Sequence, residues 1–152
     1  MRGKKPGKKS AASQKEAPKN PPWLTIAICL ALAASFAALS EGGIFASERS
    51  ISAYELSVDS PQNIIFYVFQ HSGYAHLIGN IMVVLAAGIA LEPILRKRDI
   101  AALFFGSSVF AGGLFAILNP DYSIIGASAG AIALLAGAIA LSPKKTAFNF
   151  AL

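Results

Sequence analysis

Four long apolar runs, separated by polar breaks, dominate the chain. None contains Asp, Glu, Lys or Arg, each is 16 to 19 residues long, and they span Trp23–Leu39, His76–Leu91, Ile100–Leu118 and Ile124–Leu141. As helices that rise about 1.5 Å per residue, they would be roughly 24–29 Å long, just short of a ~30 Å hydrocarbon core. The pattern therefore predicts an all-α, polytopic membrane bundle with four transmembrane helices, in a domain over residues 22–152.

The composition agrees with a membrane protein. Of the 152 residues, 55% are hydrophobic and 14% are charged, whereas soluble domains carry about 25% charged residues. Cys29 is the single cysteine, so an intrachain disulfide is excluded, and two histidines could hold a metal only with help from carboxylates. We expect neither a metal nor a cofactor.

The positive charge is concentrated outside the apolar runs. Seven of the thirteen basic residues lie before Pro21, in a stretch rich in Ser, Pro and Gly that we expect to be a disordered tail over residues 1–21. Further basic residues follow the second and fourth runs, at 96–98 and 144–145. The positive-inside rule then predicts cytoplasmic termini, with the loop 40–75 outside. The tail would contact anionic lipid rather than nucleic acid. A cleaved signal peptide in the first run remains an alternative.

Polar residues occur at two places within these runs. His76 and Asn80 are four residues apart and would share one helix face near the outer surface. Gly126 and Gly130 have the GxxxG spacing of packed membrane helices, and Ser128 lies between them. In the predicted topology, Asn80 and Ser128 lie at similar depth. A nucleophilic serine needs a base and oxyanion donors, but ordinary packing and interhelical hydrogen bonding would account for the same residues.

These segments resemble the rhomboid family of intramembrane serine proteases. The stretch 69–80, with Gly88 and Glu92 beyond it, looks like the second-helix signature of that family. The run Gly126-Ala127-Ser128 resembles the start of its catalytic GxSG box. The order also agrees, with a long outer loop, an HxxxN helix, a third helix and then the serine helix. The resemblance covers roughly residues 23–152.

The resemblance implies a function for each of these residues. Ser128 would attack a peptide carbonyl of a transmembrane protein substrate, without metal or cofactor. His76 and Asn80, with the backbone N–H of Ser128, would stabilise the oxyanion, and Gly126 and Gly130 would allow close helix packing. Two features differ from the family pattern. Ala129 stands where the box has Gly, and the Trp-Arg pair of the bacterial outer loop is missing.

A larger difference concerns the general base, which in the family is a histidine on the sixth transmembrane helix. Neither His71 nor His76 matches that position. The stretch 146–152 begins a new, mostly apolar segment, so we expect the sequence to be incomplete at its C-terminal end. A serine protease that lacks its base loses on the order of 10³- to 10⁶-fold in activity.

Two other functions therefore stay open. One is an inactive rhomboid-like protein that binds transmembrane clients, and the other is a small, unrelated assembly protein that uses the GxxxG spacing. The oligomeric state is not indicated by the sequence.

Overall fold

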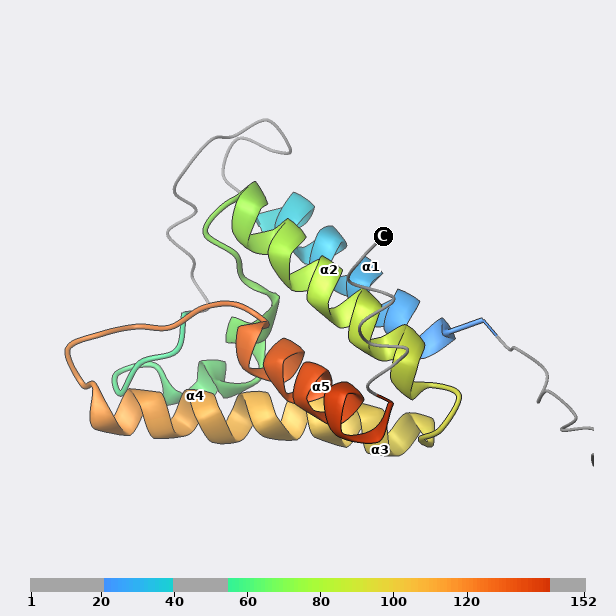
Figure 1. The fold of residues 1–152 in the computed structure, drawn as a ribbon. Coiled ribbons are helices and arrows are strands. Elements are labelled where there is room, and N and C mark those ends of the chain that lie inside the picture. The colour runs from blue at the N-terminus through green and yellow to red at the C-terminus, as the bar shows by residue number, and fades with distance from the viewer. Residues whose placement is uncertain (1–20, 40–54, 143–152) are drawn as a thin grey trace, which may run out of the picture.

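The computed structural model describes residues 21–39 and 55–142, and this part of the chain is all-α, as predicted (Figure 1). The expectations for the basic tail and for residues 146–152 lie outside the described residues. The elements in chain order are α1 (Trp23–Leu39), the 3₁₀ turns η2 (Pro61–Ile64) and η3 (Phe66–Phe69), α2 (Tyr74–Leu91), α3 (Lys97–Ala101), the π-helical turn η4 (Ala102–Gly106), α4 (Ser107–Leu118) and α5 (Ser128–Leu141).

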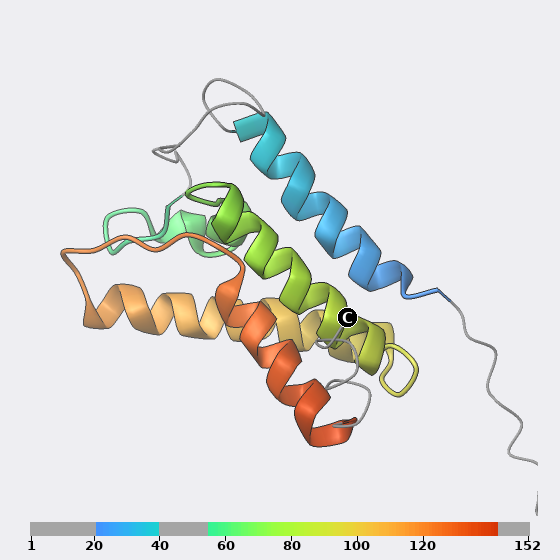
Figure 2. The same cartoon turned by 45° about the horizontal axis from the view of Figure 1, so that its top comes forward.

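Helices α1 and α2 lie side by side and antiparallel (Figure 2). At one end of the pair, the rings of Phe36 and Tyr74 meet edge to face with centroids 5.1 Å apart. At the other end, both the backbone N–H and the hydroxyl of Thr25 donate to the Glu92 carboxylate at 2.6 Å. The carboxylate thus satisfies an otherwise free N–H in the first turn of α1. Gly88 makes this approach possible, because a Cβ there would overlap the Thr25 side chain.

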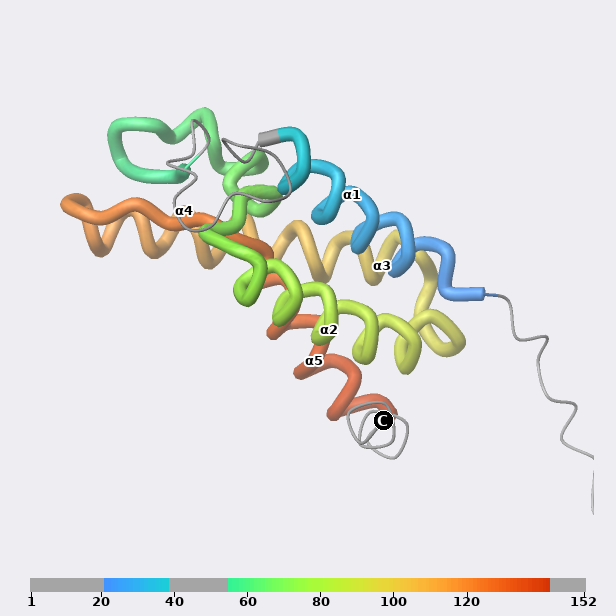
Figure 3. The backbone as a smooth tube through the Cα atoms, turned by 90° about the horizontal axis from the view of Figure 1, so that it is seen from above, coloured from blue at the N-terminus to red at the C-terminus, as the bar shows by residue number. Residues whose placement is uncertain are grey.

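The third helical segment is continuous from Lys97 to Leu118 and lies beneath α1 and α2 when the molecule is seen from above (Figure 3). Its π-helical turn, η4, packs against α5. A Cβ on Gly130 would lie 2.7 Å from both the Phe104 carbonyl oxygen and the Ser108 hydroxyl. The absence of a side chain at Gly130 therefore lets α5 and the third helical segment approach closely.

Helix α5 begins at Ser128, four residues after the expected start at Ile124. The preceding segment is extended, and Ile124 exchanges two backbone hydrogen bonds with Leu56, at 2.9 and 3.0 Å. Gly126 has a φ of +107°, which is incompatible with a right-handed helix. The prediction that Gly126 and Gly130 form one helical GxxxG face is therefore wrong. Small apolar residues continue the hydropathy pattern before the helix begins, so the pattern does not reveal its start.

Two helices in the described part of the chain are long and apolar enough to cross a membrane, Tyr74–Leu91 and Lys97–Leu118. The apolar helices Trp23–Ala38 and Ser128–Leu141 are shorter. Large apolar side chains such as Leu30, Met82 and Phe110 are more than half exposed on the outside of the bundle. Such a surface suits contact with lipid rather than water.

Candidate active site

The starts of α2 and α5 meet at the same end of the bundle. The two helices pack along each other in the same direction. The Gly126 backbone adjoins the His76 ring near the start of α2, and a Cβ built on Gly137 would lie 3.8 Å from Cδ1 of Leu91 at its end. The histidine and the serine predicted from sequence therefore lie at one end of the bundle, although their positions are 52 residues apart in the chain.

The Gly126 backbone forms one wall of the position occupied by the His76 ring. A Cβ on Gly126 would lie 2.6 Å from Cε1 and 2.7 Å from Nε2 of the imidazole. Glycine is thus required at this position for two reasons. It can adopt the positive φ, and it leaves the space that the imidazole ring fills. On its other side, His76 Nδ1 lies 3.3 Å from the Ser72 hydroxyl. The contact directs the Nε2 edge of the ring toward the turn that leads into α5.

Ser128 is the first residue of α5, and its side chain is half-buried. The first backbone hydrogen bond of the helix runs from Ala131 N–H to the Ala127 carbonyl, at 2.9 Å. The N–H groups of Ser128, Ala129 and Gly130 therefore have no acceptor within the described residues. Free N–H groups at a helix start favour negative charge. An anionic oxygen beside Ser128 would find donors there.

Asn80 lies one turn beyond His76 on α2 and is buried. Its side-chain amide donates to the backbone carbonyl of His76 at 3.1 Å. One of the two amide N–H groups is thereby left for another acceptor. The assignment of Asn80 and His76 as oxyanion donors stays a prediction.

Tyr67 holds the surrounding segments together, and sequence reasoning missed it. The side chain is fully buried, and its hydroxyl donates to the Ser108 carbonyl of α4 at 2.6 Å. Its backbone carbonyl accepts the Gly126 N–H at 2.9 Å. Gly112 leaves room for the phenol, because a Cβ there would lie 2.5 Å from the hydroxyl oxygen. One residue of the loop thus fixes both α4 and the turn before Ser128.

His71 is a second residue of this region, and sequence reasoning only excluded it as the general base. It is buried just before α2, and its ring lies edge to face with that of His76, with centroids 5.0 Å apart. Burial is the main cause that lowers the pKa of His71, to about 4, and the neighbouring His76 adds to it. The Phe69 carbonyl opposes the shift without meeting hydrogen-bond geometry. The sequence feature that could have pointed to His71 is its position, because it is a second histidine only five residues before His76.

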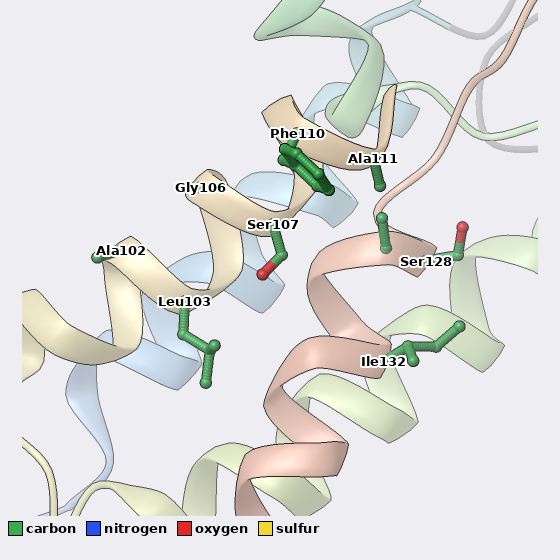
Figure 4. Close-up of a pocket in the computed structure, with 9 residues that line it drawn as sticks. Ala102, Leu103, Gly106, Ser107, Phe110, Ala111, Ser128 and Ile132 are labelled. Carbon is green, nitrogen blue, oxygen red and sulfur yellow. The ribbon is translucent and has the colours of Figure 1, made fainter. Parts of the chain in front are cut away.

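A groove of about 680 Å³ lies beside Ser128, between the third helical segment and the first turns of α5. Small and apolar residues line it, together with two serines (Figure 4). The Ser107 hydroxyl points into the gap between the two helices, whereas the Ser128 hydroxyl points in another direction (Figure 4). Within the described residues, Ser128 has no hydrogen bond to either histidine. The described chain also has no cluster of three or more His, Cys, Asp or Glu side chains that could hold a metal.

Comparison with known proteins gives a consistent result. The Rhomboid domain family matches residues 59–151. Rhomboid-related protein 2 of Mus musculus is 34% identical over 74 residues, which are 48% of this chain and 24% of that protein. Rhomboid-related protein 1 of Caenorhabditis elegans is 33% identical over 69 residues, which are 45% of this chain and 19% of that protein. The aligned residues are thus a quarter or less of each relative. No solved structure matches the chain.

Proposed function

Because the chain belongs to the rhomboid family, we propose that it carries the nucleophile and oxyanion site of an intramembrane serine endopeptidase. The observation that carries this proposal is the contact between Gly126 and the His76 ring. That contact brings an imidazole to the turn directly before Ser128, next to a helix start whose first three N–H groups have no acceptor among the described residues. A serine used only for helix packing would need neither the imidazole nor the glycine with positive φ.

In the proposed reaction, the Ser128 hydroxyl attacks a peptide carbonyl of a transmembrane protein substrate. The developing oxyanion receives hydrogen bonds from the backbone N–H of Ser128 and from the side chains of His76 and Asn80. Donors of this kind act strongly in a site with little water, and the loss of one typically costs 10²- to 10³-fold in rate. Cleavage would occur near the outer membrane face, with the N-terminus in the cytoplasm.

The test is cleavage of a transmembrane substrate by the full-length protein in proteoliposomes. Ser128→Ala should abolish cleavage and leave the unfolding transition unchanged, because the side chain makes no hydrogen bond to the described residues. Ser107→Ala is the matched control, since Ser107 lines the same groove and should retain activity. Unchanged cleavage by Ser128→Ala would show that Ser128 is not the nucleophile.

A second candidate function is the binding of transmembrane clients without cleavage. It is favoured by one observation, namely that neither described histidine forms a hydrogen bond to Ser128. If this function is correct, the protein retains client transmembrane segments in a detergent pull-down, and Ser128→Ala retains them equally well. Cleavage products that depend on Ser128 would exclude it.

A further inference from the structure

The two nitrogens of the His76 ring face different surroundings. Ser72 lies two residues before α2 begins at Tyr74, and its hydroxyl oxygen is 3.3 Å from Nδ1 of the ring. At the opposite edge stands the backbone of Gly126, where a Cβ would lie 2.7 Å from Nε2. The ring of His71 packs edge to face against the imidazole, with centroids 5.0 Å apart. The ring is thus in contact at both edges and on a face.

The contact with Ser72 is the one that distinguishes nitrogen from carbon. A half-turn of an imidazole about its Cβ–Cγ bond exchanges Nδ1 with Cδ2 and Nε2 with Cε1, and the shape of the ring stays nearly the same. The packing of His71 and the wall formed by Gly126 depend on shape, so they fit both orientations. Within the part of the chain that the structure describes, Ser72 makes the one hydrogen bond to the His76 ring. The hydroxyl therefore selects the ring orientation that turns Nε2 toward the segment before Ser128.

The same hydrogen bond bears on the position of the ring proton. A neutral imidazole carries one proton, on either Nδ1 or Nε2, and a serine hydroxyl can donate or accept. If the Ser72 hydroxyl donates to Nδ1, the ring proton is on Nε2 and can be donated to an oxyanion. If the hydroxyl instead accepts from Nδ1, then Nε2 has only a lone pair. At 3.3 Å the contact is long, as catalytic hydrogen bonds often are before substrate binds.

We propose that Ser72 is a positioning residue, which donates its hydroxyl to Nδ1 of His76 and thereby keeps the ring proton on Nε2. The inference rests on the proposed protease function, in which His76 Nε2 donates to the oxyanion. As charge develops on the substrate oxygen, the hydrogen bonds from Ser72 through the imidazole to that oxygen polarise one another. This gain exists in the transition state and not in the bound substrate, so it should raise kcat and leave KM unchanged.

Threonine and valine at position 72 give a matched pair of variants, because they differ mainly in the hydroxyl. The Ser72 side chain is exposed, so both replacements have room. With full-length protein in proteoliposomes, kcat of Ser72→Val should fall by about three- to tenfold, the effect of one net hydrogen bond, while KM stays within about twofold. Ser72→Thr should keep kcat within about twofold of wild type. Ser72→Ala should behave like Ser72→Val, and it replaces that variant in the comparison if valine prevents folding.

Two kinetic results would overturn the proposal. Equal kcat values for the variants with and without the hydroxyl would show that the hydroxyl does not act in the reaction. A raised KM with unchanged kcat in Ser72→Val would show that the residue serves substrate binding or local structure instead.

A spectroscopic measurement locates the proton without reference to activity. In full-length protein labelled with ¹⁵N-histidine, protonated and unprotonated ring nitrogens resonate in separate regions, and the His76 signals are assigned by their loss in His76→Gln. Wild type and Ser72→Thr should carry the proton on Nε2, whereas Ser72→Val should show a measurable share on Nδ1. Ser123→Ala is the control, because its hydroxyl donates to the Glu55 carboxylate at 2.9 Å and its loss should leave these signals unchanged. A proton on Nδ1 in wild type, or one that stays on Nε2 in Ser72→Val, would overturn the inference.

The two experiments separate this inference from the protease assignment. If the Nε2 proton depends on the Ser72 hydroxyl but Ser128→Ala still cleaves substrate, the protease assignment fails while the positioning of the ring proton stands. If Ser128→Ala abolishes cleavage but Ser72→Val changes neither kcat nor the His76 signals, the protease assignment stands and this inference fails.

Discussion

Replacement of Gly126 by alanine tests the geometry of the candidate site most sharply. Alanine at a φ of +107° costs about 1–3 kcal/mol in backbone strain. The new methyl carbon would also lie 2.6 and 2.7 Å from two atoms of the His76 ring, where ordinary contact begins at about 3.4 Å. The ring or the turn must therefore move by most of an ångström. Overpacking of this kind adds about 1–3 kcal/mol, so the unfolding free energy should fall by about 2–6 kcal/mol in total.

The catalytic effect should exceed what this loss of stability explains. A displacement near 1 Å can lower a rate about 10²-fold, and the loss of an oxyanion donor costs a similar factor. In bicelles at a temperature where Gly126→Ala is still folded, we expect substrate cleavage to fall about 10²-fold. Stability is measured by reversible unfolding in mixed micelles, and activity on the folded fraction alone.

Gly79→Ala is the matched control for this experiment. Gly79 lies on α2 one residue before Asn80, and a Cβ there would have nothing within 4 Å. Alanine favours a helix over glycine by up to about 1 kcal/mol, so this variant should be as stable as wild type or slightly more stable, with normal cleavage. If Gly126→Ala behaved like Gly79→Ala in both assays, the reasoning about the His76 contact would be refuted.

Three further predictions concern stability. Thr25→Val removes the hydroxyl that donates to Glu92 at 2.6 Å and should lower the unfolding free energy by about 1–3 kcal/mol, whereas no loss would mean that this bond does not stabilise the α1–α2 pair. Tyr67→Phe removes the buried bond to the Ser108 carbonyl and should cost about 1 kcal/mol in the same unfolding assay; an unchanged midpoint would argue against it. The pKa of His71 is about 4 in the folded protein and 6.5 in the unfolded chain. Between these two values the unfolded state binds more protons than the folded state. About 3 kcal/mol of stability should therefore be lost as the pH falls from 7 to 4. His71→Leu should flatten this pH dependence, and an identical slope in both proteins would contradict the assignment.

The sequence predicts the all-α class because its apolar runs of 16 to 19 residues are too long for strands and suit helices. The first run, Trp23–Leu39, coincides with α1, since the polar residues beside it stop the apolar pattern where the helix stops. The same reasoning fails at α5. Gly126 and Ala127 are as apolar as the helix that follows, and hydropathy carries no information on a positive φ. Only the backbone shows that the helix begins at Ser128.

Long-range contacts explain the other residues that the sequence did not single out. Thr25 and Glu92 are 67 residues apart, and neither alone indicates that a carboxylate completes the first turn of α1. Tyr67 and His71 lie in a loop whose aromatic and polar residues would equally suit a membrane interface. Their importance comes from burial and from the partners that α2, α4 and α5 provide, which a single sequence does not reveal.

The central claim is that Ser128 is a nucleophile, and a chemical measurement tests it most directly. Full-length protein in its native membrane is treated with a fluorophosphonate, digested, and analysed by mass spectrometry to locate the adduct. We predict one adduct on Ser128, lost in Ser128→Ala and sharply reduced in Gly126→Ala. An adduct on Ser107 instead, or a folded protein in which Ser128 stays unmodified while cleavage proceeds, would contradict the account.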